Sequence, residues 1–103
     1  MKKQAIEVTT FKLTRGTTCK AFIKANAAEV DPWLKRQPGF QSRRIAERDD
    51  GTIVDMLIWG SAAQGKAAAT RLMRELSDSV VHSMIDQRTV LWTVSPIRHQ
   101  VSH

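Results

Sequence analysis

Residues 51–64, GTIVDMLIWGSAAQ, form an apolar strand that is interrupted by one acid and followed at once by a helix start. Side chains two residues apart on a strand share a face, so Asp55, Leu57 and Trp59 point to one side, and the opposite side is wholly apolar. A strand that is mostly apolar on both faces needs cover on both. In a chain of 103 residues we expect a second subunit to supply part of that cover.

Asp55 is the one charged residue of this strand, and a carboxylate among apolar neighbours needs a partner, a pocket or a proton. It has two interpretations. Asp55 acts as a general base or a substrate-orienting group, or it is paired for structural reasons with an arginine such as Arg44 across the hairpin. Trp59 has the same two interpretations, because it can stack on an aromatic ligand or anchor the core.

The composition is that of one ordinary globular domain, residues 1–103, with a net charge of +6 and a pI of about 10.1. The sixteen basic residues are spread along the chain, and strand alternation divides the tightest group, Arg43, Arg44 and Arg48, between two faces. We therefore expect no nucleic-acid partner. No apolar run approaches the roughly 18 residues of a membrane span, which predicts a cytoplasmic protein without membrane contact. Cys19 is alone, and no Cys or His cluster predicts a metal site.

The pattern of apolar residues and turn signals predicts the order β-α-β-β-α-β, a ferredoxin-like α+β fold with a four-stranded antiparallel sheet. Right-handed crossovers place both helices on one face of the sheet, and the bare face predicts a homodimer. The strands are expected at 5–13, 40–48, 52–59 and 89–94. The helices are expected from a Thr17 or Thr18 cap, from Asp31-Pro32 for a short second segment, and from the Ser61 cap along a stripe ending at Met84.

Three stretches of this sequence resemble the dimeric α+β barrel superfamily, in particular antibiotic-biosynthesis-monooxygenase-like domains. They are WLKRQPGF at 33–40, the Asp50-Gly51 turn, and IWGSAA at 58–63. Cofactor-free, quinone-forming oxygenases of that group carry an Asn and a Trp four residues apart on the third strand, and Asp55 and Trp59 match these positions. The resemblance implies a pocket for a phenolic compound between sheet and helices, with no metal or organic cofactor.

Two departures from the family pattern bear on activity. A carboxylate in place of the Asn is able to deprotonate a phenol, but it repels the phenolate unless a cation lies nearby. The chain also has no tyrosine, although some of those enzymes use pocket tyrosines. The haem-degrading branch needs an Asn on the first strand and a Trp and a His on the second long helix, and the first strand here has no Asn while that helix has no Trp.

The sequence therefore predicts a small-molecule enzyme that resembles cofactor-independent monooxygenases acting on aromatic or polyketide-like compounds. Asp55 is the predicted catalytic residue, and the predicted substrate-binding residues are Trp59, Leu57 and Arg44. The alternative is a non-catalytic ligand-binding or stress-associated homodimer. RNA-recognition domains share the element order, but they place stacking aromatics at alternate positions that this third strand lacks.

Overall fold

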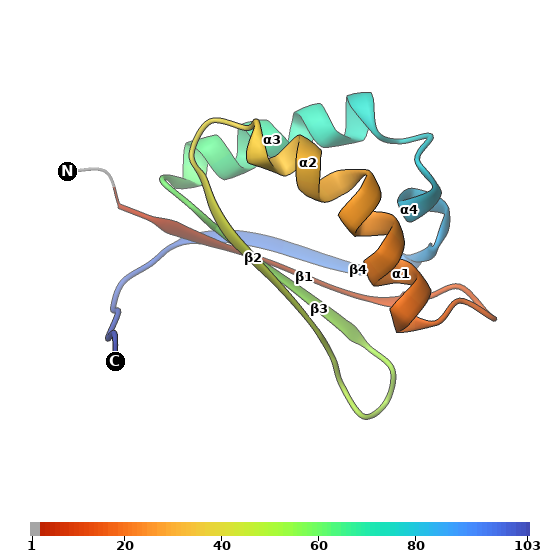
Figure 1. Ribbon diagram of the computed structural model, residues 1–103. Coiled ribbons are helices and arrows are strands. Elements are labelled where there is room, and N and C mark those ends of the chain that lie inside the picture. The colour runs from red at the N-terminus through yellow and green to blue at the C-terminus, as the bar shows by residue number, and fades with distance from the viewer. Residues whose placement is uncertain (1–2) are drawn as a thin grey trace.

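The computed structural model describes residues 3–103 and has the predicted α+β fold (Figure 1). The elements in chain order are β1 (Ala5–Leu13), α1 (Cys19–Ala28), α2 (Val30–Lys35), β2 (Phe40–Glu47), β3 (Ile53–Trp59), α3 (Ala62–Glu75), α4 (Val80–Ser83) and β4 (Ile85–Pro96). The strands form one antiparallel sheet in the order β2-β3-β1-β4. The helices all cover the same face of this sheet, and the other face is left open.

The helix starts follow the capping residues that the sequence offers. Thr18 caps α1 by accepting a hydrogen bond from the backbone N–H of Ala21 at 3.1 Å, and Ser61 caps α3 by accepting one from Gln64 at 3.2 Å. α2 begins at Val30, slightly before the predicted Asp31-Pro32 start. Pro32 is tolerated there because N–H groups of the first helical turn have no partner within the helix.

The prediction of one long helix from Ser61 to Met84 is wrong. α3 ends at Glu75, and the chain begins a new helix, α4, at Val80. Ser79 is the reason, because its side chain accepts a hydrogen bond from the backbone N–H of His82 at 3.1 Å and so caps a second helix. β4 then starts at Ile85 rather than at residue 89, because the residues after α4 pair with the end of β1 beyond a bulge.

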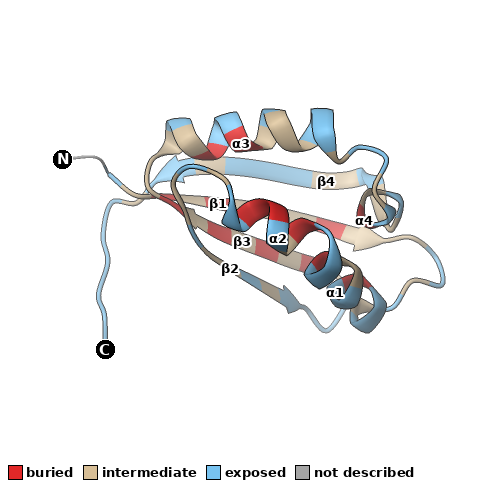
Figure 2. Cartoon of the chain, turned by 45° about the horizontal axis from the view of Figure 1, so that its top comes forward, coloured by how far each residue is buried: buried red, intermediate tan, exposed pale blue. Residues whose placement is uncertain are grey.

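The core lies between the sheet and the helices (Figure 2). Along β3, every second residue from Ile53 to Trp59 is buried under the helices, and the residues between them, on the open face, are only half-buried. The largest buried apolar side chains on the helix side are Phe11, Phe22, Trp33, Leu34, Ile53, Leu57 and Trp59. Asp55 therefore lies on the side of the sheet that the helices cover. A carboxylate buried there needs a charged or hydrogen-bonding partner.

Candidate active site

A cavity of about 140 Å³ lies between the sheet and the helices. Apolar side chains form most of its wall, and they include those of Leu57 and Trp59, two of the residues expected from the sequence to bind substrate. Five polar side chains also line it, and they come from four different elements: Glu7 and Thr9 on β1, Asn26 on α1, Arg43 on β2 and Asp55 on β3. An apolar pocket with a few convergent polar groups is the usual form of a small-molecule site.

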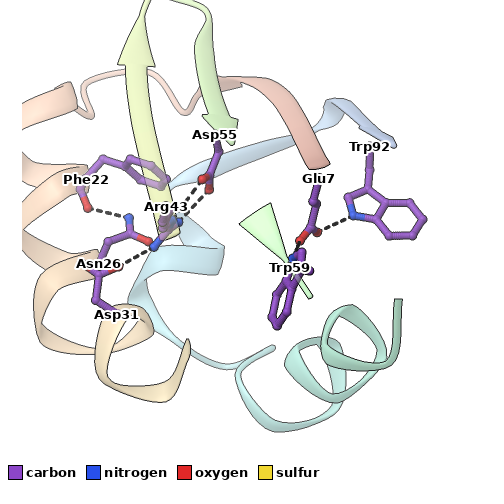
Figure 3. A network of polar contacts seen from close by, with 8 residues as sticks. All are labelled: Glu7, Phe22, Asn26, Asp31, Arg43, Asp55, Trp59 and Trp92. Atoms are coloured by element: carbon purple, nitrogen blue, oxygen red, sulfur yellow. Dashed lines mark hydrogen bonds and ion pairs between the residues drawn. The ribbon is translucent and has the colours of Figure 1, made fainter. Parts of the chain in front are cut away.

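Asp55 is held by a two-point ion pair with Arg43 (Figure 3). The Arg43 Nε donates to Oδ1 of Asp55 at 3.0 Å, and Nη2 donates to Oδ2 at 2.7 Å. Both side chains are about one-tenth exposed, at 10% and 11%. Nη1 of Arg43 donates to Asp31 at 2.8 Å, so one guanidinium joins two carboxylates. This paired arrangement is the strong form of the arginine–carboxylate contact.

The predicted partner of Asp55, Arg44, is wrong, and Arg44 does not line the cavity. β2 has a register shift between Phe40 and Ser42, after which Arg43 is paired with Leu57 and Arg44 with Met56. Residues paired across strands share a face, so Arg43 points under the helices and Arg44 lies on the open face. Simple alternation placed the two arginines on opposite faces, but it did not show which of the two faced Asp55.

Arg43 supplies the cation that a carboxylate in this position needs. Burial alone would lower the pKa of its guanidinium, but the hydrogen bonds and charges of Asp55 and Asp31 outweigh burial and raise that pKa. Arg43 therefore stays charged at every pH at which the protein is folded. A ligand that becomes negatively charged beside Asp55 therefore lies next to this guanidinium.

Trp59 is fixed on several sides. Its side chain is 1% exposed, and its ring meets that of Phe40 edge to face, with centroids 5.7 Å apart. α3 passes closely over the indole at Gly65, where an added Cβ would lie 2.9 Å from Cδ1 of Trp59. The Trp59 Nε1 donates to Oε1 of Glu7 at 2.8 Å. The indole is thus a rigid wall of the cavity with a set orientation.

Glu7 is a polar residue of the site that sequence reasoning missed. It is 8% exposed, and its second oxygen, Oε2, accepts a hydrogen bond from the Trp92 Nε1 at 2.6 Å (Figure 3). Burial is the main cause that raises the pKa of Glu7 above 4.5; the two indole hydrogen bonds oppose it, and the charge of Asp55 adds to it. The sequence did contain a sign of this: Glu7 lies four residues before Phe11 and so shares a face of the first strand with it.

The raised pKa of Glu7 has a defined effect on stability. The folded state holds this proton more tightly than the unfolded chain does, so this group makes the protein less stable as the pH rises from about 4.5 through the folded-state pKa. A buried carboxyl group that lowers the folding stability in this way is a candidate functional group.

Asn26 is the second polar residue that the sequence did not single out, although it occupies the apolar stripe of α1. Its side chain is 1% exposed, and its Nδ2 donates to the backbone carbonyl of Phe22 at 2.8 Å. Its Oδ1 is buried and has no hydrogen-bond partner among residues 3–103. Buried acceptors are nearly always paired, so this oxygen is free for a donor on a ligand.

Neither a metal-binding cluster nor a membrane-spanning helix is found in the described part of the chain. Among residues 3–103, no group of three or more His, Cys, Asp or Glu side chains lies close enough to hold a metal ion. None of the helices in that part of the chain is long and apolar enough to cross a bilayer.

The whole structure is similar to those of two oxygenases from Streptomyces species. SnoaB, a cofactor-independent oxygenase from Streptomyces nogalater, matches with a TM-score of 0.72 and 14% identity over 98% of this chain and 99% of its own. A monooxygenase from the gene ActVA-Orf6 of Streptomyces coelicolor, in complex with nanaomycin D, matches with a TM-score of 0.75 and 19% identity over 98% and 93%. The chain has the antibiotic-biosynthesis-monooxygenase fold. No family model and no curated protein sequence matches it.

Proposed function

We propose that this protein is a small-molecule enzyme, a cofactor-independent monooxygenase that acts on phenolic, polyketide-like aromatic compounds. The support is the cavity, which combines an apolar wall, a fixed indole and a buried ion pair at the positions where the resembling oxygenases carry their functional residues. The likeness to SnoaB and to the ActVA-Orf6 monooxygenase agrees with this activity. The cavity is close to the size of the roughly 150 Å³ engineered cavities that hold one benzene ring.

The proposed reaction converts a phenol to a quinone with dioxygen as co-reactant. The phenolic O–H and one ring C–H bond break, one oxygen atom enters the ring as the second carbonyl, and the other leaves as water with the two hydrogens. Loss of the phenolic proton comes first, because the phenolate is the electron-rich form that reduces dioxygen. The protein must therefore bind the ring, accept its proton and stabilise the anion.

In this proposal Asp55 and Arg43 act as a unit at the polar end of the cavity. Asp55 orients the guanidinium and the ligand, and Arg43 offsets the repulsion between that carboxylate and the phenolate. Trp59 is the stacking wall, and Leu57 lies beside it in the substrate pocket. Arg44, which lies on the open face, has no part in ligand binding.

The unpaired Oδ1 of Asn26 is the observation that carries the proposal. An unpaired buried acceptor costs about 1–3 kcal/mol, and a ligand hydroxyl that donates to it removes that cost. The free protein thus has a built acceptor for a ligand hydroxyl other than the one that loses its proton, in a cavity that holds an aromatic ring.

Replacement of Asn26 tests this role. We expect Asn26→Leu to leave folding stability unchanged or raise it by about 1 kcal/mol, because it removes an unpaired polar atom, and to weaken phenol binding roughly tenfold. Urea denaturation and titration with 1,5-dihydroxynaphthalene, followed by fluorescence, measure the two effects. Parallel loss of stability and binding would show that Asn26 serves the fold alone.

Oxygen uptake separates the enzyme from a binding protein. We expect the parent protein to consume one dioxygen per quinone formed from a hydroxylated fused-ring aromatic. Tight binding of such compounds without oxygen uptake would favour the alternative, a non-catalytic ligand-binding or stress-associated homodimer. No binding of any phenolic aromatic would end both.

The basic charge gives a separate prediction. We expect mobility-shift titrations at physiological salt to show no selective binding of RNA or DNA, because the charge of +6 is spread along the chain. Weak retention at low salt is expected to disappear steeply as salt is added. Tight, salt-resistant RNA binding would contradict this. We also propose that the protein is a cytoplasmic homodimer.

A further inference from the structure

Glu7 lies where the inner cavity meets a second, larger hollow. This hollow, the α3–β4 groove, has a volume of about 590 Å³ and is mostly apolar. Its wall includes Met73 of α3 and Val90 and Trp92 of β4. The cavity and the groove share Glu7, Thr9, Phe11, Ala69, Leu72 and Ile85, so the two hollows adjoin along the centre of the sheet.

The two buried carboxylates of the cavity differ in the groups that bind them. Both oxygens of Asp55 accept hydrogen bonds from Arg43, and protonation would break that charged pair. Within the part of the chain that the structure describes, Glu7 forms no ion pair, and its two hydrogen-bond donors are the neutral indoles of Trp59 and Trp92. A carboxylate has about four lone-pair sites, so Glu7 retains room for one more donor on each oxygen.

We propose that Glu7 is the proton acceptor of the site, and that it acts on an acidic hydroxyl of a fused-ring aromatic whose first ring fills the inner cavity and whose remainder lies in the α3–β4 groove. The inference rests on the proposed function and deepens it, by naming the base and the size class of the substrate.

The proton balance is simple. The ligand O–H bond breaks, a new O–H bond forms on a carboxyl oxygen of Glu7, and the electron pair stays on the ligand as a phenolate. The neutral Glu7 no longer repels Asp55 or the phenolate, and the Arg43 guanidinium faces both remaining anions. The raised pKa of Glu7, caused mainly by burial, makes it a better proton acceptor than an exposed glutamate. Asp55, which is held in its ion pair with Arg43, does not provide a base of this kind.

The charged and titratable groups around Glu7 are few. Asp55 of β3 and Arg43 of β2 act on it through their charges. Lys66 of α3 and His82 of α4 line the groove with it. None of these four donates a hydrogen bond to Glu7, whereas Trp92, 45% exposed at the groove, does. Trp92 therefore covers the Glu7 carboxylate from the groove side.

The pH dependence of 1-naphthol binding tests the proposal, with phenol as the one-ring comparison. Neutral naphthol binds Glu7 only when the carboxylate is ionised. We therefore expect the affinity for naphthol to rise with pH as Glu7 loses its proton, and this rise is called the acid limb of the binding profile. We expect Glu7→Gln to lack this limb and Asp55→Asn to keep it. An acid limb that persists in Glu7→Gln would overturn the assignment. Failure of the parent to bind either compound would instead end the proposed function.

Trp92→Phe provides a second test that does not depend on the folding of Glu7→Gln. It keeps an aromatic ring at a half-exposed position but removes the N–H that stabilises the Glu7 carboxylate. We expect the acid limb to move to higher pH. An unmoved limb, or a shift to lower pH, would contradict the role of Glu7.

Indole resonances of the free protein provide a ligand-independent check. We expect the Nε1–H signals of Trp59 and Trp92 to share one titration step above pH 4.5, which disappears in Glu7→Gln. Trp33 donates to Glu75 instead, so we expect its signal to be unchanged by Glu7→Gln. The groove predicts roughly tenfold tighter binding of naphthol than of phenol, because a second ring buries apolar surface there. Equal affinity for the two compounds would remove the fused-ring part of the proposal.

Discussion

Arg43→Met is expected to lower the free energy of unfolding by about 3–5 kcal/mol, the usual cost of breaking a buried ion pair by removing one partner. The change leaves Asp55, one-tenth exposed, without its cation and next to the second carboxyl of Glu7. It also removes the hydrogen bond to Asp31. Because a domain of this size has only about 5–15 kcal/mol of stability, a large fraction would be lost.

Urea denaturation of the variant and the parent at a fixed protein concentration measures this loss.

The neighbouring arginine is a matched control. Arg44→Met removes the same charge from the same strand, but the Arg44 side chain lies on the open face and has no ion pair with Asp55. We expect it to change stability by less than about 1 kcal/mol. If both variants lost equal stability, the Arg43–Asp55 pair would not be the source of the effect. Asp55→Asn should fall between them, because Arg43 keeps Asp31 and an amide oxygen.

The fold was predictable from the sequence because its signals are local. Thr18 and Ser61 are hydrogen-bonding caps, and Gly51 has the positive φ of 86° that the hairpin turn requires. The element order then limits the topology to few choices. The break after Glu75 was missed because the apolar stripe continued across it, and Ser79 was not weighed as a new cap.

The site was predictable only in part. Asp55, Leu57 and Trp59 lie on one phase of one strand, so their shared face follows from alternation alone. The partner of Asp55 depends on a one-residue register shift in β2, which reverses the faces of Arg43 and Arg44, and no sequence pattern indicated it. Glu7 and Asn26 were hidden because each follows an apolar pattern, and their contacts come from residues 52 or more positions away or from the helix itself.

The open face of the sheet leads to the second large effect. Most of the residues that point away from the helices along the two central strands are apolar and only half-buried in the single chain: Ile6, Val8, Val54, Met56 and Ile58. Thr10, which is paired with Val54, is a polar exception. Leu91 of the edge strand β4 is 72% exposed. An apolar patch of this kind is costly in water, and we propose that a second copy of the same face covers it by simple two-fold symmetry.

Met56→Glu is expected to convert the protein from a dimer into a monomer. Met56 is paired with Val8 on one side and Arg44 on the other, which places it in the interior of the open face. Two symmetry-related copies would bury two like charges there, which an apolar interface does not tolerate. Light scattering at micromolar concentration should give twice the chain mass of 11.6 kDa for the parent and a single chain mass for the variant.

Ile23→Glu is the control that ties this effect to the open face. Ile23 is an apolar residue of α1 with 41% exposure, so it lies on the helix side of the molecule. The same charge placed there should leave the dimer intact. A stable monomeric parent would contradict the dimer, and loss of the dimer in both variants would place the interface elsewhere. Because Glu7, Asp55 and the cavity lie on the covered side of the sheet, Met56→Glu also tests whether ligand binding requires the dimer: a folded monomer that still binds 1-naphthol would show that each chain carries a complete site.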